Sequence, residues 1–475
     1  MFQINNHQEL ANTEPDQLLD LANHFFGKLL TRHEIPLQEP FFQQLLSSAC
    51  FTPTPSIIQR QFYHECQRCY NRKRSLFATL PCISCKEDHV YCRKCILMGR
   101  VIECEPLYYW SGVEPIWPEV ENPCAWTGKL TDAQEHAARR ISTAVINRQK
   151  ELLVWGVCGS GKTEMLFPAV TLGLERGQRI CIATPRTDVV HELLPRFSEA
   201  FPSVRVQGLY GGGEKDEGRA QIVITTTHQL LRYKGAFEMM VIDEIDAFPY
   251  HADPMLPLAT QRAKKRMSTT IYLTATPRRK QRIRLQWGRL PHVFVPIRYH
   301  GYPLPVPRLQ MSFSLKRDLA NHQPPACLLN WLDQRENKQR QLLIFVPTIP
   351  LAKQLSEQLA PFLININNSR SSIDFVHAED HNREEKITMF RENKTHILLT
   401  TTILERGVTF PAIDVAVLDA GHIVFDEAAL VQIAGRAGRS HLDPTGEVVF
   451  FHDGKTNGMY DAIDSIHMMN HRGGL

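Results

Sequence analysis

Short apolar runs recur along the chain in two series, separated by segments of helical pattern. The first series lies at 152–155, 180–183, 222–225, 240–242 and 271–273, and the second at 342–346, 373–376, 397–400, 415–418 and 448–451. Strands that alternate with helices form parallel sheets, because each helix returns the chain to the start of the next strand. The pattern therefore predicts an α/β protein with two tandem parallel-sheet lobes.

The composition is that of a globular protein with several domains. The chain has 475 residues, of which 43% are hydrophobic and 22% are charged, so neither disorder nor a membrane protein is indicated. No apolar run is long enough to span a bilayer, and the first residues lack the features of a signal peptide. We therefore expect a cytoplasmic protein. The formal charge of +4 permits a nucleic-acid partner without arguing for one.

The patterns change several times along the chain, which predicts successive parts. These are an N-terminal helical region at 1–60, a cysteine-rich zinc knuckle at 61–103, a connector at 104–128, a first lobe at 129–290, a proline-rich linker at 291–308 and a second lobe at 309–475. In the first part, the spacing of Leu18, Leu21, Phe25 and Leu29 is that of one apolar helix face, which is ordinary core spacing.

A glycine-rich segment follows the first apolar run of the first lobe and matches the pattern Gly-x-x-x-x-Gly-Lys-Thr. Backbone N–H groups at such a strand-to-helix turn converge on a phosphate, and glycines leave room for it. The residues expected to bind the nucleotide are Gly156, Gly159, Ser160, Gly161, Lys162 and Thr163. Lys162 would reach the β- and γ-phosphates of ATP, and Thr163 would hold Mg²⁺. A plain glycine-rich turn is the alternative.

Two polar motifs follow later strands of the same lobe. Asp243 and Glu244 end an apolar strand, so Asp243 would face Mg²⁺ and Glu244 would polarise the attacking water. A solvated acidic turn is the alternative. Thr274 and Thr276 would couple this motif to the nucleotide through their hydroxyl groups. Upstream, Gln134 opens a helix, where its amide could pair with adenine.

In the second lobe, Gln432, Arg436 and Arg439 share a turn with two glycines. Arginine offers a fixed and always charged fork that suits a γ-phosphate in its transition state. Supplied from a second lobe, Arg436 and Arg439 would act as arginine fingers. Ordinary surface arginines are the alternative.

Candidate nucleic-acid contacts come from basic and hydroxyl residues. Between Met255 and Leu290 there are ten Lys and Arg residues and no Asp or Glu, which favours phosphate tracking over a merely solvated face. Hydroxyl-bearing and basic residues also follow strands, where they suit a sugar-phosphate backbone. The residues singled out are Arg186, Thr226, Thr227 and Thr401.

Six cysteines form three Cys-x-x-Cys pairs within a short segment: Cys66 with Cys69, Cys82 with Cys85, and Cys92 with Cys95. Two pairs suffice for one tetrahedral zinc, because each turn presents two thiolates to the same point. The first pair could combine with either of the others. Unrelated buried thiols are the alternative.

Taken in order, these motifs resemble those of the superfamily-two helicases and translocases. The matching elements are Leu-Thr-x-x-Gln at 130–134, the phosphate loop, Thr-Pro-Arg at 184–186, Asp-Glu-Ile-Asp at 243–246, Thr-Ala-Thr at 274–276, the stretch that ends at Gly407, and Gln-x-x-Gly-Arg-x-Gly-Arg at 432–439. The resemblance implies two RecA-like lobes with ATP at their interface, Gly407 among the nucleotide-binding residues, and nucleic acid crossing both lobes.

Within that superfamily the chain is most similar to the ComFA family of late-competence DNA translocases. The likeness rests on the knuckle that ends at 91–101, on 243–249, on 300–307 and on 402–411. It implies zinc ligands Cys66, Cys69, Cys92 and Cys95, with Cys82 and Cys85 as the alternative pair. It also implies single-stranded DNA, a membrane DNA-uptake channel and other late-competence proteins as partners, and it leaves open both a homo-oligomer and attachment to the inner face of the cytoplasmic membrane.

We therefore expect a DNA-stimulated ATPase that uses ATP, Mg²⁺ and Zn²⁺ and moves along single-stranded DNA during natural transformation. A repair or replication-restart helicase is the first alternative. The second is a zinc-containing DNA-binding scaffold in which ATP only switches the conformation.

Overall fold

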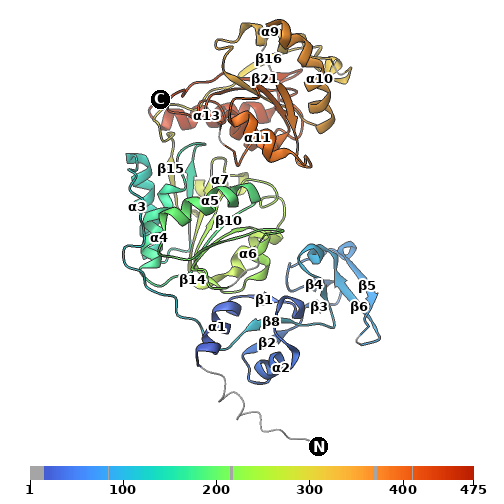
Figure 1. Ribbon diagram of the computed structural model, residues 1–475, viewed down its shortest axis with the longest axis vertical. Helices are drawn as coiled ribbons and strands as arrows, with labels where there is room; N and C mark the ends of the chain where they lie inside the picture. Colours follow the sequence, from blue (N-terminus) through green and yellow to red (C-terminus); the bar gives the residue numbers. More distant parts are fainter. Residues whose placement is uncertain (1–14, 84, 214–217, 322, 367–371, 409) are drawn as a thin grey trace, which may run out of the picture. The chain divides into compact units, whose positions relative to one another are not determined.

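The computed structural model describes residues 15–475 except 84, 214–217, 322, 367–371 and 409 (Figure 1). The chain divides into two compact units. The first unit takes the chain up to 129 together with 138–153 and 166–273, and the second takes 130–137, 154–165 and 274–475. The phosphate loop thus groups with the second unit rather than with the rest of its lobe.

The first lobe is built on a seven-stranded sheet. In spatial order its strands are β11 (Val206–Leu209), β12 (Ile222–Thr226), β10 (Ile180–Thr184), β13 (Phe237–Ile242), β14 (Lys264–Thr274), β9 (Glu151–Gly156) and β15 (His292–Val295). The pairings from β11 to β14 are parallel. Every residue of β10 and β12 is buried, as expected for strands covered on both faces.

Helices connect these strands and cover the sheet. They are α3 (Asp132–Ile146), α4 (Phe167–Leu174), α5 (Thr187–Ala200), α6 (Met255–Ala263) and α7 (Arg279–Gln286). Helix α5 packs against β10, β11 and β12 through an apolar face that includes Val190 and Phe197. The expected βαβ alternation is therefore present.

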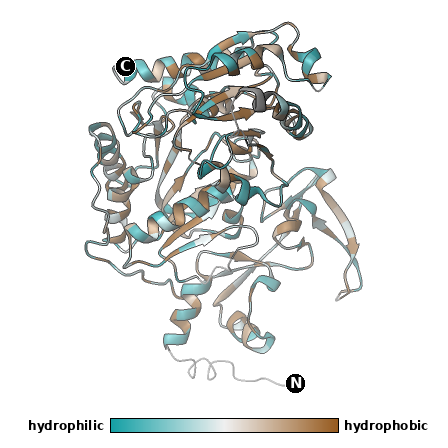
Figure 2. Ribbon diagram, turned by 45° about the horizontal axis from the view of Figure 1, so that its top comes forward, coloured by the Kyte–Doolittle hydropathy of each residue, from teal (hydrophilic) through white to brown (hydrophobic). Residues whose placement is uncertain are grey.

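The second lobe is built on a six-stranded sheet. Its strands, in spatial order, are β16 (Arg308–Met311), β21 (Val448–His452), β20 (Ile413–Val417), β17 (Gln341–Phe345), β19 (Ile397–Thr400) and β18 (Ile373–Val376). All five pairings are parallel. The strands of both sheets are drawn mostly in brown in Figure 2, because they form the apolar cores.

The helices of the second lobe are α8 (Leu315–Ala320), α9 (Ala326–Gln334), α10 (Ile349–Ile366), α11 (Arg383–Arg391), α12 (Glu427–Ala434) and α13 (Asn457–Arg472). A buried charge cluster ties α9 to the sheet: Asp414 of β20 lies 2.7 Å from Arg335 and 3.1 Å from Arg340. Asp414 is fully buried, and the two guanidinium groups together with the N–H of Glu447 compensate for its lost hydration.

The two parallel sheets confirm the predicted fold class, but three edge strands were not predicted. β11 has only four residues, and β15 and β16 lie at the two ends of the segment expected to be a linker. Each is short, and the prolines around β15 and β16 mask its pattern. The helix expected directly after Thr163 begins only at Phe167, because a 3₁₀ turn over Glu164–Leu166 precedes it.

The N-terminal region forms a small antiparallel sheet, β1 (Leu29–Leu30), β8 (Leu107–Trp110) and β2 (Phe51–Thr54), packed with α1 (Pro15–Phe25) and α2 (Glu39–Ser47). Phe25, Phe42, Phe51 and Trp110 form its buried aromatic core. Leu29 is buried as expected, but it belongs to β1, because α1 ends at Phe25.

The cysteine-rich segment consists of short strands and turns. β3 (Ile57–Gln59) pairs with β4 (His64–Cys66), and β6 (Asp88–Cys92) lies between β5 (Phe77–Pro81) and β7 (Val101–Ile102). Strands this short bury little apolar surface, so the segment needs another source of stability.

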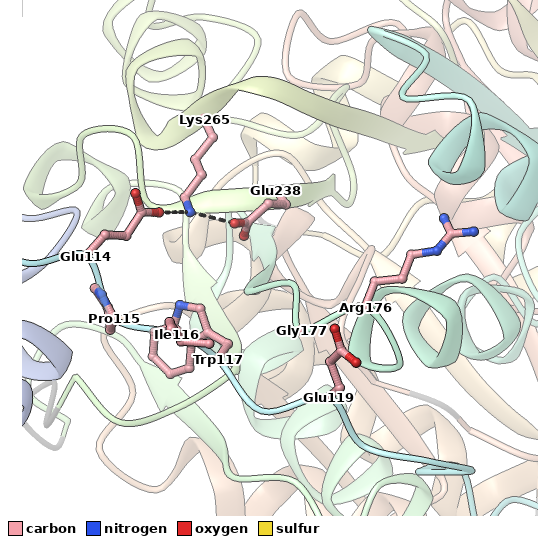
Figure 3. Close-up of a pocket in the computed structure, with 9 residues that line it drawn as sticks. All are labelled: Glu114, Pro115, Ile116, Trp117, Glu119, Arg176, Gly177, Glu238 and Lys265. Carbon is pink, nitrogen blue, oxygen red and sulfur yellow. Dashed lines mark hydrogen bonds and ion pairs between the residues drawn. The ribbon is translucent and has the colours of Figure 1, made fainter.

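The connector packs on the first lobe. Arg179 is fully buried and its guanidinium lies 4.7 Å from the ring centroid of Trp117. Beside Trp117 there is a surface pocket of 380 Å³, in which Lys265 bridges the carboxylates of Glu114 and Glu238 (Figure 3). Burial alone would lower the pKa of Lys265, but the two carboxylates raise it. No motif residue lines this pocket, so we interpret its ion pairs as contacts that hold the connector on the first lobe.

Candidate nucleotide, nucleic-acid and metal sites

The phosphate loop needs its glycines. Gly159 has φ +78° and Gly161 has φ +67°, which side-chain-bearing residues rarely adopt. A Cβ on Gly161 would lie 2.3 Å from Gln134 Nε2, and one on Gly156 would lie 2.8 Å from Ser160 Oγ. The loop is therefore both conformationally and sterically closed to larger residues at these points.

Two polar side chains of the loop, Lys162 and Ser160, would have better hydrogen-bond partners if a phosphate were bound. Lys162 Nζ donates to the carbonyl oxygens of Gly156 at 3.1 Å and Val157 at 3.0 Å, so the ammonium is folded back over its own loop. Ser160 Oγ is buried and has no hydrogen-bond partner among the residues that the structure describes. A buried hydroxyl without a partner is costly, so these residues fit a polyphosphate ligand.

Gln134 holds the loop in place. Its Nε2 donates to Ser160 O at 3.0 Å, and its Oε1 accepts from the backbone N–H of Thr131 at 2.8 Å. Both ends of the amide are therefore engaged with the protein. Pairing with adenine would require at least one of these bonds to exchange, and that role stays a prediction.

The acidic motif lies at the carboxyl end of β13. The backbone N–H of Asp243 donates to Ala183 O at 2.8 Å, which fixes it beside β10. Glu244 has φ +52°, and its N–H donates to Asp243 Oδ1 at 2.8 Å. A positive φ at a non-glycine residue costs conformational energy and is typical of sites where the side-chain direction matters.

The two threonines predicted to couple to this motif are buried at the end of β14 and just after it. Thr274 Oγ1 accepts from the backbone N–H of Thr276 at 3.0 Å, and both residues are nearly inaccessible. The N–H of Ile245 donates to Leu273 O at 3.3 Å, so the acidic motif lies beside the end of β14. The coupling role of the two threonines stays a prediction.

The Gln432–Arg439 turn contributes to two sets of contacts within the second unit. Gln432 Oε1 accepts from Cys158 Sγ of the phosphate loop at 2.9 Å. Arg436 is only 1% exposed and donates to Val408 O and, at 2.9 Å, to Glu405 O. Arg439 is half-buried, and its Nε donates to Gly435 O at 3.1 Å. The two arginines are thus not equivalent: Arg436 holds the loop that ends near Gly407, which has φ +75°.

One residue beside the loop was not predicted from the sequence. Arg298 is 2% exposed, and it donates to the carbonyl oxygen of Gly438. The next residue, Tyr299, donates its N–H to Gly159 O at 3.0 Å. Arg298 Nε and Nη2 are buried and have no hydrogen-bond partner within the described part of the chain. Burial lowers the pKa of Arg298 to about 10, and the charge of Arg439 contributes.

The sequence signal for Arg298 was weak. It is a single arginine between Pro296 and Pro303, in a stretch whose prolines indicate a linker. Its value comes from tertiary contacts, which the local pattern does not encode.

The predicted nucleic-acid residues differ in how accessible they are. Arg186 and Thr401 are half-buried, Thr226 is 6% exposed and Thr227 is fully buried. The N–H of Thr227 donates to Thr184 O at 2.9 Å, so two of the segments that follow strands lie side by side. In this conformation Thr227 supports the edge of the sheet, and Arg186 is better placed for a phosphate.

Part of the basic stretch has structural partners. Arg262 donates to the carbonyl oxygens of Gln67 and Arg68, both at 2.8 Å, and Lys265 fastens the connector. Arg278 lies 2.6 Å from Asp426, and Arg282 pairs with Glu427. The stretch is therefore not one uniform phosphate-tracking surface.

The outer cysteine pairs meet in one buried cluster. Cys66 Sγ lies 3.6 Å from Cys95 Sγ, and Cys69 Sγ lies 3.6 Å from Cys92 Sγ. Sulfurs bound at about 2.3 Å to one tetrahedral zinc lie about 3.8 Å apart, so the spacing fits that metal. Hydrogen bonds among the four thiols raise the pKa of Cys69 and Cys95 and lower that of Cys66 and Cys92. The middle pair lies elsewhere.

This cluster is attached to the rest of the first unit by ion pairs. Arg68 is fully buried and lies 2.6 Å from Glu34, which also pairs with Arg232 at 2.7 Å. Burial raises the pKa of Glu34, but the two arginines outweigh it and the net shift is downward. Lys94, between Cys92 and Cys95, lies 2.8 Å from Asp253 in the segment that follows the acidic motif.

Comparisons with known proteins agree with this architecture. Residues 13–109 match the family described as the competence protein ComFA N-terminal domain. Competence protein ComFA of Bacillus subtilis is 41% identical over 453 residues, which are 95% of each chain. That of Streptococcus pneumoniae is 35% identical and covers 95% of this chain and 99% of its own. The chain belongs to the ComFA family.

The two lobes of this ComFA family member match families of their own. Residues 127–279 match the type III restriction enzyme res subunit, and residues 323–441 match the helicase conserved C-terminal domain. The structure of Saccharomyces cerevisiae Dbp5 bound to RNA and ADP BeF3 has the same fold, with a TM-score of 0.52 at 17% identity, over 72% of this chain and 88% of that one. The lobes are therefore the RecA-like lobes of a superfamily-two helicase.

These matches identify a competence-associated, helicase-like ATPase that uses ATP and Mg²⁺ and binds nucleic acid. In the described part of the chain, no helix is both long enough and apolar enough to cross a membrane.

Proposed function

We propose that this ComFA family member is an ATP-driven motor that moves along single-stranded DNA and draws transforming DNA across the cytoplasmic membrane in natural competence. The carrying observation is the phosphate loop, whose buried Ser160 hydroxyl and folded-back Lys162 are arranged for a ligand with several phosphates. Its two ComFA relatives support the competence role.

In this proposal each predicted residue of the ATP site has a role. Lys162 exchanges the carbonyl oxygens of Gly156 and Val157 for the phosphate oxygens of ATP. Thr163 and Asp243 hold Mg²⁺, which supplies electrostatic stabilisation of the phosphoryl transfer. Glu244 accepts a proton from the attacking water.

The second lobe would supply cations for the transition state. Arg439 is the better candidate for direct contact, since it is half-buried, whereas Arg436 is buried and donates to the carbonyl oxygens of Glu405 and Val408 in its own lobe. Arg436 would then keep the loop around Gly407 in place. Gln432 reaches Cys158 and would report the state of the phosphate loop.

Arg298 would bind the phosphates together with Lys162. The next residue, Tyr299, donates its backbone N–H to Gly159 O of the loop. The Arg298 guanidinium has N–H groups without a hydrogen-bond partner among the described residues. A buried guanidinium without an anion is unfavourable, so an incoming phosphate would relieve the cost. This makes the nominal linker a part of the nucleotide site.

DNA would contact the edge at which Arg186 lies and the segment at Thr401. Half-buried Arg186 supplies a charged donor for phosphate oxygens, and Thr226 and Thr401 supply hydroxyl donors. The Cys66, Cys69, Cys92 and Cys95 cluster would hold one structural zinc that fixes the knuckle.

The ATPase rate with single-stranded DNA, duplex DNA and RNA, compared side by side, tests the proposal. Single-stranded DNA should stimulate the wild-type chain most. Lys162→Ala and Glu244→Gln should both abolish turnover, while the glutamine variant keeps ATP binding. Normal DNA-stimulated turnover in either variant would refute the assignment.

The same assays distinguish the two alternatives. A repair or replication-restart helicase would separate strands of a forked substrate, whereas a pulling motor need not. A scaffold switched by ATP would bind DNA without any stimulation of turnover.

A further inference from the structure

A second group of three cysteines lies outside the buried cluster. Cys85 Sγ lies 3.4 Å from Cys82 Sγ, and Cys104 Sγ lies 3.7 Å from Cys82 Sγ. All three sulfur atoms are within 4.8 Å of one another. Cys82 and Cys85 follow β5, and Cys104 follows β7, so two separate turns bring the thiols together.

The spacing of these sulfurs matches that of a metal site. A tetrahedral zinc with bonds of about 2.3 Å holds its sulfurs about 3.8 Å apart. The buried cluster has separations of 3.6 Å, and the second group has 3.4 and 3.7 Å. The two groups therefore have the same internal geometry.

The backbone of the middle pair repeats the backbone of the first pair. In the first turn, Tyr70 N–H donates to Cys66 O at 2.8 Å and Cys66 N–H donates to Asn71 O at 3.1 Å. In the second, Lys86 N–H donates to Cys82 O and Cys82 N–H donates to Glu87 O, both at 2.9 Å. The same bonds thus recur at the same spacing, although the sequences between the cysteines differ.

Both turns contain a residue with positive φ at the same position. Tyr70 has φ +57° and Lys86 has φ +60°, each directly after the second cysteine of its pair. Residues with a Cβ rarely adopt this conformation, and neither position is a glycine. The arrangement points both thiols of a pair to one side, which is the task of a zinc knuckle.

We propose that Cys82, Cys85 and Cys104 form a second zinc site, separate from the buried one. Among the described residues, no fourth His, Cys, Asp or Glu ligand atom joins these three. Cys85 is exposed and the other two are half-buried, so water takes the fourth position. The buried site has four sulfur ligands and is closed, whereas this site keeps one position open to water.

Zinc content of the full chain, purified in a reducing buffer, tests this proposal by elemental analysis. We expect two zinc ions per chain in the wild type and one in Cys85→Ser and in Cys104→Ser. Cys124→Ser is the matched control, because Cys124 is a half-buried cysteine outside both groups, and it should retain two. Cys85 is exposed, so its replacement should leave the chain folded, and a cooperative unfolding transition in this variant separates metal loss from misfolding.

Two further measurements use the thiols themselves. After exchange with Co²⁺, the difference spectrum between wild type and Cys85→Ser should contain a thiolate-to-cobalt charge-transfer band. In denaturant with chelator, a thiol reagent should count all 12 cysteines. One zinc per chain in the wild type, no difference band, or two missing thiols from a disulfide would each overturn the proposal. None of these readouts depends on ATP turnover, so failure here leaves the motor proposal untouched.

Discussion

Replacing Arg298 with methionine should weaken ATP binding while leaving the nucleotide-free chain at least as stable. Burial lowers the pKa of Arg298 from 12.5 to about 10. At about 1.4 kcal/mol per pKa unit, keeping this buried guanidinium charged costs on the order of 3 kcal/mol. Methionine removes that cost and fills a similar volume, although Gly438 O loses its donor.

The loss in affinity follows from the bonds that the guanidinium would make. A hydrogen bond to a charged group contributes about 1.5–3 kcal/mol, which corresponds to a loss of about 10-fold to 150-fold in ATP affinity. Titration with a fluorescent ATP analogue measures the dissociation constant, and thermal unfolding without nucleotide measures stability. Arg317→Met is the matched control, because Arg317 is an arginine with 76% of its side chain exposed.

A particular pair of results would refute this reasoning. If Arg298→Met binds ATP within about twofold of the wild type and loses stability without nucleotide, then Arg298 is a structural residue that anchors Gly438. The control variant should change neither quantity.

Three further predictions concern Glu34 and the two arginines of the second lobe. Glu34→Gln leaves the fully buried Arg68 uncompensated, so denaturant unfolding should report a loss of about 3 kcal/mol; an unchanged midpoint would contradict this. Because folding lowers the pKa of Glu34, its stabilisation is complete above the unfolded value of 4.5 and is lost as pH falls from there through the folded value. A pH series of the wild type should decline in that range more steeply than that of Glu34→Gln. Arg436→Met should lower the unfolding temperature by several degrees, since the Glu405 and Val408 carbonyl groups lose their donor. Arg439→Met should lower turnover with little change in the unfolding temperature. If Arg436→Met lowers only turnover and Arg439→Met lowers only the unfolding temperature, the two roles are exchanged.

Much of the fold could be predicted because the buried strands are apolar throughout. Ile180–Thr184 and Ile397–Thr400 stand out in the sequence, since parallel strands are covered on both faces. β15 and β16 could not be found in this way, because edge strands are short and the prolines beside them favour a linker. The local sequence pattern predicts strands that are buried on both faces better than it predicts strands at the edge of a sheet.

The candidate sites show the same limit. Spacing identified the phosphate loop and the three Cys-x-x-Cys pairs, because their chemistry requires nearby residues in sequence, while the choice of the outer pairs came from the resemblance to the ComFA family. It did not identify Arg298, Cys104 or the inward direction of Arg436, since each depends on contacts with residues far away in the chain. Roles that depend on tertiary contacts need a structure.

The attachment of the knuckle has a mechanical consequence. Arg262 of α6 donates to the carbonyl groups of Gln67 and Arg68, and Lys94 pairs with Asp253. These contacts attach the cysteine-rich segment to the unit that contains β13 and β14. The cysteine-rich segment and these strands should therefore move together. In the proposed motor, a protein that binds the knuckle would therefore hold β13 and β14 in a fixed position, so that each ATP-driven movement would act on the DNA.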